Sequence, residues 1–404
     1  MTKRNPRSKL IMFYLRSPRL RKLYRGLKER IPIVTSRINK SVLGTNHQIL
    51  SREMSFVNIF DISSERLSNV KLYGKTRIIS LDEHNATIFI ARTDLPLEVL
   101  LEQYLIQEEV LQLAKIDLDE ESLYITPAIS GMKLFGNWVT LLDPSSNNWM
   151  HFISEVLPNA IESARHLEGD LFGILVDNSL SKSSYELIKI AFPGVPMVLL
   201  EENQPIEVET LITGDISARS ASYFWPRNKQ KTLGNYTFSR ANLLDCRTLI
   251  TNHLRLQNSS DEMMIKLYVK RKSYFRRVVN HDLIEQYLRK NGFQVIEPSE
   301  NNLIEQIELF SKAKVVVAQA GAALANIIFM QSGSYVYSLM ADSEWIDYEY
   351  FARYSEVFGV KFIPVLGKVV GENKLVEEGI GTVLHPMNAN FNIDPLDLIA
   401  AVEQ

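Results

Sequence analysis

Two side chains one helical turn apart, His151 and Glu155, have the types and the spacing for acid–base chemistry. They stand in the segment 148–158, which opens an expected helix, and positions i and i+4 of a helix project from the same face. A neutral imidazole or a carboxylate beside a cleft takes the proton of an attacking hydroxyl, and Glu155 alternatively orients His151. The same spacing suits a surface ion pair or a helix cap, so both interpretations stay open.

A run of cations directly follows an expected strand, Ile265–Lys270, and suits an anionic ligand. The run includes Arg271, Arg276 and Arg277. Ligands of parallel sheets bind beyond the carboxyl ends of the strands, and the planar, permanently charged guanidinium group pairs with phosphate oxygens in a bidentate manner. The run therefore predicts a diphosphate site, with a solvated basic turn as the alternative.

A turn of small residues, among them Gly321 and Ala322, follows another expected strand, Lys314–Ala318. Small side chains let a ligand approach the backbone, and the N–H groups at the start of the next helix attract phosphate. The glycine spacing differs from that of the dinucleotide-binding fingerprint. Tight packing of a helix on a strand is the alternative explanation for the small residues.

The elements that must position these residues alternate between strands and helices. Residues 76–142 are β-rich, with a charged helix expected near 96–113, and residues 151–200 continue as helix, strand, helix and strand. A helix is expected after Ser239, and beyond it strands separated by single helices predict a parallel, doubly wound sheet. Asp394 and Pro395 begin a final helix, which we expect to pack back across the two lobes.

The length of 404 residues and the hydrophobic content of 46% predict two lobes with a core each. We place an N-terminal acceptor lobe at 41–245 and a C-terminal donor lobe at 246–404. The single cysteine, Cys246, excludes an intramolecular disulfide and a multi-cysteine zinc site, and it favours a reducing compartment. No run approaches the ~20 apolar residues needed to cross a bilayer.

The first forty residues form a separate basic segment. They hold thirteen lysines and arginines against one acid, Glu29, whereas the rest of the chain is acidic. Leu20, Leu23, Tyr24 and Leu27 share one helical face. This pattern predicts attachment to an anionic membrane surface, at the inner face of the membrane in the cytoplasm. A solvated tail is the alternative, and nucleic acid is disfavoured because the acidic remainder repels phosphate.

Three stretches, in this order along the chain, resemble glycosyltransferase family 61, in particular its bacterial members linked to capsular or other surface polysaccharides. The resemblance covers residues 130–404. It is carried by the segments Trp149–Phe152 with Glu155–Pro158, Tyr268–Arg271 with Arg276, Arg277 and Asn280, and Glu305–Ile307 through Phe310, Ala313, Gly321, Ala322, Leu324, Asn326 and Phe329.

The resemblance implies an α/β fold of GT-B type, in which two Rossmann-like lobes face a cleft. It implies inverting transfer from a nucleotide-sugar donor to a glycan or lipid-linked acceptor, with no cofactor and no obligatory metal. Arg271, Arg276 and Arg277 then contact the donor diphosphate. The donor-cradling turn consists of Gly321, Ala322 and Asn326, and the base is His151 or Glu155.

Two positions depart from the family pattern. Ala320 stands where the family often has histidine, and His281 stands where an acid commonly follows the asparagine of the basic motif. Either change alters donor choice or weakens catalysis. A non-catalytic glycan- or nucleotide-binding protein, and a pyruvyl or phosphate transferase on a similar fold, are therefore the alternatives.

Overall fold

The computed structural model describes the second half of the chain most completely. Before residue 132 it describes only short strands, so the expected helix near 96–113 and the basic segment 1–40 lie outside the described residues. The described ranges are 53–54, 65–74, 78–80, 86–88, 114–117, 122–125, 132–143, 145–165, 171–201, 204–213, 218–219, 237–256, 264–271, 276–298, 302–343, 348–370 and 389–403.

The first large sheet is half parallel and half antiparallel. Its strand order is β4-β3-β2-β10-β7-β8-β9; neighbours from β10 to β9 run parallel, and neighbours from β4 to β10 run antiparallel. The strands are β2 (Glu65–Tyr73), β3 (Ile78–Ser80), β4 (Ala86–Ile88), β7 (Lys133–Thr140), β8 (Leu171–Asp177), β9 (Met197–Leu200) and β10 (Pro205–Thr213). In a small three-stranded sheet, β1 (Glu53–Met54) and β5 (Ala114–Asp117) both pair with β6 (Ser122–Ile125). In a two-stranded sheet, β11 (Ala218–Arg219) pairs with β12 (Thr237–Phe238).

The second large sheet is parallel except at its last strand. Its order is β14-β13-β15-β16-β17-β18, and only β18 runs antiparallel to its neighbour. The strands are β13 (Ile265–Val269), β14 (Phe293–Ile296), β15 (Ala313–Gln319), β16 (Tyr335–Ala341), β17 (Lys361–Val369) and β18 (Phe391–Asn392).

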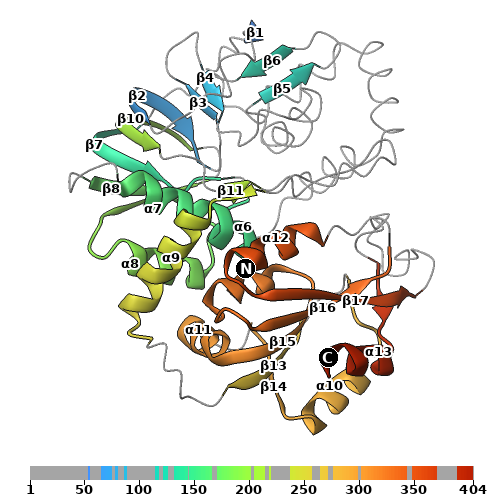
Figure 1. Ribbon diagram of the computed structural model, residues 1–404. Coiled ribbons are helices and arrows are strands. Elements are labelled where there is room, and N and C mark those ends of the chain that lie inside the picture. Colours follow the sequence, from blue (N-terminus) through green and yellow to red (C-terminus); the bar gives the residue numbers. More distant parts are fainter. Residues whose placement is uncertain are drawn as a thin grey trace, which may run out of the picture.

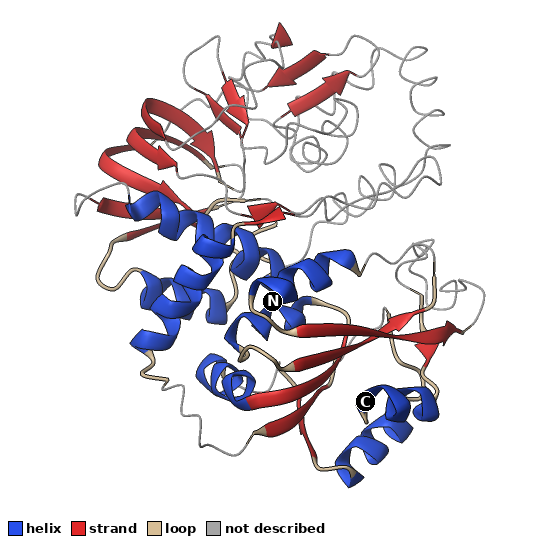
Figure 2. Ribbon diagram, viewed as in Figure 1, coloured by secondary structure: helices blue, strands red, loops and turns tan. Residues whose placement is uncertain are grey.

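Helices fill the space between the two large sheets (Figures 1 and 2). From the first half come α6 (Trp149–His151), the π-helical turn η2 (Phe152–Val156), α7 (Leu157–Arg165), α8 (Lys182–Ala191) and α9 (Arg240–His253); from the second come α11 (Leu303–Lys312), the 3₁₀ helix η3 (Ala322–Phe329) and α12 (Glu349–Val357). The far face of the second sheet is covered by α10 (His281–Lys290) and α13 (Pro395–Val402), whose Ile284, Leu288 and Leu398 are buried together.

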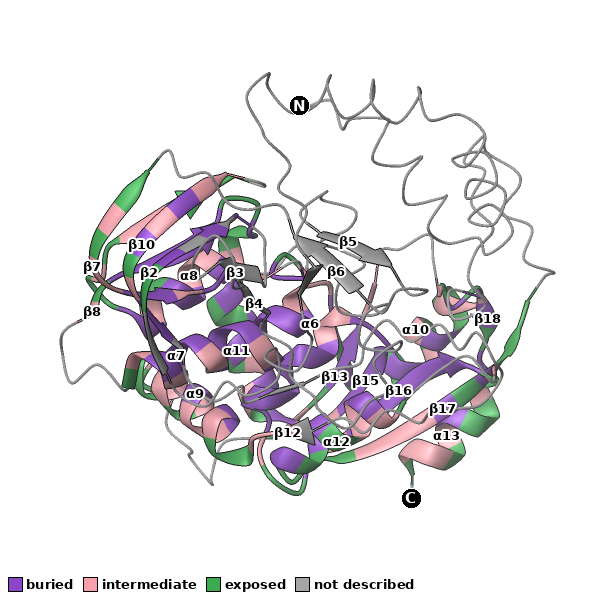
Figure 3. Ribbon diagram, turned by 90° about the horizontal axis from the view of Figure 1, so that it is seen from above, coloured by how far each residue is buried: buried purple, intermediate pink, exposed green. Residues whose placement is uncertain are grey.

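One continuous cluster of buried apolar side chains joins the two halves. It includes Phe152 and Ile174 from the first half and Val316 and Leu324 from the second, and it forms the buried centre in Figure 3. Helix α9 lies within it: Leu243, Cys246 and Ile250 form a buried stripe, and the helix packs on α7, α8, η3 and α12. Residue 245, the proposed lobe boundary, therefore lies inside a helix that both halves share.

The mixed α/β class and the alternation of strands and helices are confirmed, while the GT-B arrangement stays a prediction. The structure corrects the placement of the last helix: α13 packs on α10 and β17 of its own half rather than across the lobes. Strands β2 and β10 are additional to the expected ones. The helix expected at 322–330 has the tighter 3₁₀ winding. Within the described ranges, no helix is both long and apolar enough to span a bilayer.

Candidate active site

The helix that carries His151 and Glu155 begins at a capped end and then widens. The side chain of Asn148 accepts the N–H of Met150, which satisfies one of the free donors at the helix start. Two turns later, Pro158 has no N–H and its ring excludes the usual position of the Ser154 carbonyl. The chain responds with the π-helical turn η2, in which the N–H of Leu157 donates to the carbonyl of Phe152. Such turns often occur at functional sites.

His151 and Glu155 contact each other within this widened turn. The Nδ1 atom of His151 lies 2.8 Å from Oε1 of Glu155. His151 is buried, and only 15% of the Glu155 side chain is exposed. The pair is therefore shielded from water, unlike a surface ion pair, and the contact fixes the position of the two side chains relative to each other.

A tyrosine from the second half completes this group. The hydroxyl of Tyr350 on α12 donates to Oε1 of Glu155 at 3.3 Å and lies 2.8 Å from Oγ of Ser154. Burial raises the pKa of Tyr350 well above its usual range, and the nearby Glu155 carboxylate raises it further. The phenol therefore stays protonated and serves as a donor.

Asn326 connects the start of α6 to the second half. Its Oδ1 accepts the indole N–H of Trp149 at 3.0 Å, and its Nδ2 donates to Oε1 of Gln306 at 3.2 Å. Gln306 in turn donates to the carbonyl of Pro298. Asn326 is 1% exposed, so its amide is engaged on both sides by protein groups. The structure thus places this side chain beneath the small-residue turn, as a link between α6 and α11.

The small-residue turn and the first arginine of the basic run are in direct contact. Nη1 of Arg271, beyond the carboxyl end of β13, donates to the carbonyl of Ala320 at 2.9 Å. A Cβ atom added to Gly321 would lie 2.5 Å from the same Nη1. Gly321 is buried and its backbone is extended, so the glycine leaves room for the Arg271 guanidinium in this position, and a larger residue would require that side chain to shift. Ala322 then begins η3 and is partly exposed.

Arg276 joins Arg271 at this edge of the sheet. Its backbone takes a left-handed conformation (φ 55°), and the side chain of Gln319, at the end of β15, donates to its carbonyl. Burial lowers the pKa of Arg271, and the positive charge of Arg276 lowers it further. Arg271 and Arg276 therefore both lie beyond the carboxyl ends of β13 and β15, close enough for their charges to interact. We call this cluster, with Gly321, the arginine edge.

The other cations of the run have different surroundings. Lys270 pairs with Glu285 of α10 at 2.7 Å. Arg277 is exposed, and its backbone is fixed by Asn390 and Phe391. Asn280 exchanges two hydrogen bonds with the backbone of Ile393. Of the three predicted arginines, the structure brings Arg271 and Arg276 together.

Helix η3 relates the two groups of candidate residues. It begins directly after Gly321 of the arginine edge, and it packs on α6, which ends at His151. Sequence reasoning missed Tyr350 and Ser154. No local signal points to Tyr350, since it lies 195 residues from Glu155 along the chain. For Ser154, the one available signal was its place within the first motif, three residues after His151.

Comparison with known proteins agrees with the early resemblance. Residues 149–337 match the family model described as Glycosyltransferase 61. The match begins at Trp149 and includes the His151–Glu155 pair, the arginine edge and Asn326. None of the curated proteins compared with the chain matches it. The match covers a little under half of the chain, and it supports the conclusion that the chain is a glycosyltransferase.

Proposed function

We propose that the chain transfers a sugar, with inversion, from a nucleotide-sugar donor to a hydroxyl group of a glycan or lipid-linked acceptor, without an obligatory metal. The observation that carries this proposal is the arrangement around η3. A shielded acid–base pair lies on one side of this helix, and two clustered arginines lie at its start. Inverting transfer needs one base and a partner for the leaving diphosphate.

His151 is the proposed base, and Glu155 and Tyr350 are positioning residues. Because Nδ1 of His151 donates to Glu155 in this arrangement, the lone pair of the neutral ring is on Nε2. Nε2 takes the proton of the acceptor hydroxyl as its oxygen bonds to the anomeric carbon. The carboxylate of Glu155 then stabilises the imidazolium that forms, in the manner of other His–carboxylate pairs.

The arginine edge is the proposed site of the leaving group. The bond between the anomeric carbon and the diphosphate breaks, and the electron pair stays on the phosphate oxygen. Arg271 and Arg276 neutralise the charge that develops there, and we assign Arg277 a weaker, solvent-exposed contribution. Gly321 and Ala322 let the diphosphate approach the backbone, while Asn326 holds η3 in place rather than contacting the donor.

Three further assignments belong to this proposal. The acceptor is a capsular or other surface polysaccharide, or its lipid-linked precursor, as the family resemblance suggests. The enzyme works at the cytoplasmic face of the membrane. The basic segment 1–40 provides the attachment; a variant lacking these residues is expected to lose its association with anionic liposomes, and unchanged association would contradict the assignment.

A thermal-shift screen with UDP, GDP, CMP and their sugar forms, in the presence of EDTA, tests the proposal. A ligand at a hundred times its dissociation constant stabilises the native state by roughly 2.7 kcal/mol, so one nucleotide should raise the melting temperature clearly. The Arg276→Ala, Arg277→Ala double variant should lose this shift. A donor screen that includes phosphoenolpyruvate tests the alternative that the chain transfers a pyruvyl group. Binding without release of nucleoside diphosphate, in the presence of candidate acceptors, would identify a non-catalytic protein.

A further inference from the structure

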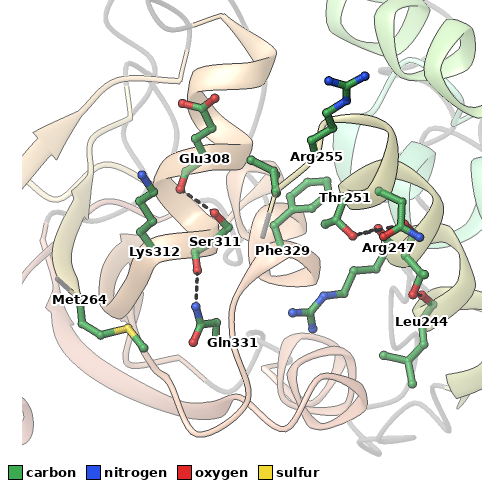
Figure 4. Close-up of a pocket in the computed structure, with 13 residues that line it drawn as sticks. Leu244, Arg247, Thr251, Arg255, Met264, Glu308, Ser311, Lys312, Phe329 and Gln331 are labelled. Atoms are coloured by element: carbon green, nitrogen blue, oxygen red, sulfur yellow. Dashed lines mark hydrogen bonds between the residues drawn. The ribbon is translucent and has the colours of Figure 1, made fainter. Parts of the chain in front are cut away.

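A cavity lies at the opposite end of the C-terminal sheet from the arginine edge. It has a volume of about 750 Å³ and opens between α9, the end of α11 and the end of η3 (Figure 4). Met264, one of its lining residues, directly precedes β13, whereas Arg271 follows that strand. At about 3.3 Å per residue of extended chain, the two ends are roughly 20 Å apart. The cavity is thus separate from the proposed donor site.

The cavity contains one arginine, Arg247, that has no anionic partner among the described residues. Figure 4 shows the Arg247 side chain extending from α9 into the cavity toward Gln331. It is half-buried, and burial lowers the pKa of its guanidinium. Within the part of the chain that the structure describes, no group forms an ion pair or a hydrogen bond with this guanidinium. A half-buried cation of this kind is unfavourable until an anion pairs with it.

The net charge of the lining also favours an anion. Three cations line the cavity, the exposed Arg255 and Lys312 and the half-buried Arg247, and Glu308 is the one carboxylate among the described lining residues. Arg255 and Glu308 are both exposed. The planar guanidinium of Arg247 suits an oxyanion, which it binds through two parallel N–H groups.

The hydroxyl groups of the lining point to the rest of the ligand. Thr248 donates its proton to the carbonyl of Leu244, Thr251 donates to that of Arg247, and Ser311 donates to that of Glu308. These hydroxyls therefore offer a ligand acceptor lone pairs. Gln331 likewise uses its NH₂ group on the carbonyl of Ser311, which leaves its oxygen as an acceptor. A ligand that fits must carry both an oxyanion and several O–H donors.

We propose that this cavity binds an anionic saccharide, such as a sugar phosphate or a uronate, with its oxyanion on Arg247 and its hydroxyls on Thr248, Thr251 and Ser311. The apolar walls formed by Leu244, Leu256 and Met264 suit the C–H faces of a sugar ring. The site is independent of sugar transfer, because it shares no residue with the arginine edge or with the His151–Glu155 pair.

Titration calorimetry with glucose 1-phosphate, glucuronate, glucose and inorganic phosphate tests this site. The two anionic saccharides should bind, glucose should bind at least tenfold more weakly, and Arg247→Ala should weaken anion binding at least tenfold. Arg240→Ala is the matched control, since Arg240 is exposed on the same helix and does not line the cavity. The control should bind as the unmodified protein does.

A second variant separates this site from the donor site. Arg276→Ala should leave binding of glucose 1-phosphate unchanged. If Arg276→Ala loses this binding while Arg247→Ala keeps it, the ligand lies at the arginine edge and the proposal is overturned. Equal affinity for phosphate and glucose 1-phosphate would overturn the saccharide assignment, and so would absence of binding by every probe. If Arg247→Ala melts at a lower temperature, Arg247→Gln, which keeps most of the side-chain volume, replaces it and should show the same loss.

Discussion

The two parts of the candidate active site are organised in opposite ways. Around His151, the protein supplies the partners: Glu155 accepts from the imidazole, Tyr350 donates to Glu155, and Ser154 lies beside the phenol. At the arginine edge, two like charges are held near each other, and Arg271 donates to a main-chain carbonyl rather than to a carboxylate. The partners of the acid–base group are side chains that the fold brings together, whereas the described hydrogen bond of the Arg271 guanidinium is to the main chain.

This difference suggests how the two parts divide the reaction. A base must already have the correct tautomer and orientation when the acceptor arrives, so its partners are built into the fold. Cations that bind a leaving diphosphate must instead keep their donors available to it. In the proposed reaction, a diphosphate beside Arg271 and Arg276 would reduce the charge repulsion between them.

The largest expected effect is that of Glu155→Gln. The amide has nearly the same shape, but it lacks the charge that stabilises protonated His151. General-base catalysis contributes roughly 10²- to 10⁴-fold, so kcat should fall at least a hundredfold in a turnover assay. Donor affinity should stay within twofold, since Glu155 belongs to the pre-organised group. A large loss of donor affinity would show that the two groups are not separate.

Arg276→Ala is expected to act on binding instead. Hydrogen bonds to charged groups contribute about 1.5–3 kcal/mol, so the dissociation constant of the nucleoside diphosphate should rise roughly tenfold to a hundredfold, as measured by calorimetry. Arg277→Ala, in the exposed neighbour, should weaken binding less. Equal losses in the two variants would show that the diphosphate lies further out than the arginine edge.

Tyr350→Phe should have a moderate effect on turnover. It removes the hydroxyl that donates to Glu155 and lies beside Ser154, and one neutral hydrogen bond contributes about 0.5–1.5 kcal/mol. We expect kcat to fall several-fold with the donor KM unchanged. The control is Tyr354→Phe on the same helix, whose hydroxyl donates to the carbonyl of Ala325; it should affect stability but not kcat. Equal kcat values for Tyr350→Phe and the unmodified enzyme would remove Tyr350 from the positioning group.

The smallest effect on donor affinity is expected for Lys270→Gln, because Lys270 is paired with Glu285 rather than placed at the arginine edge. Affinity should change less than twofold. The substitution should instead change the stability of the fold at acid pH. The hydrogen bond from Lys270 lowers the pKa of Glu285 below its ordinary value of 4.5, so the pair stabilises the fold above about pH 4.5 and loses this contribution as the pH falls below it. Melting curves between pH 3 and pH 7 should show that the melting temperature of the variant falls less on acidification than that of the unmodified protein.

The sequence was informative where a signal is local. Most strands and helices after residue 132 follow from apolar periodicity and caps, and Asp394–Pro395 marks the last helix as expected. Strand β10 was missed because Glu207 and Glu209 interrupt its apolar residues, although Ile206 and Val208 alternate with them and are fully buried.

The candidate site was less accessible to prediction. The motifs singled out His151, Glu155 and Arg271 and suggested Glu155 as a partner of His151. They gave no information on the partners that come from other elements. Tyr350 reaches Glu155 only through tertiary packing, and the structure commits the Asn326 amide to Trp149 and Gln306. These contacts depend on how α12 and η3 pack against α6, which no local pattern encodes.

The core shared by the two halves has a consequence for engineering this enzyme. Donor halves of two-lobed enzymes are attractive parts to exchange, but a cut at residue 245/246 would divide α9 between Leu243 and Ile250, both buried against the two halves. Each fragment would present a wide apolar surface to water. The halves should therefore melt in one transition, and a functional chimera would have to keep α9 whole together with the η3 and α12 surfaces that it contacts.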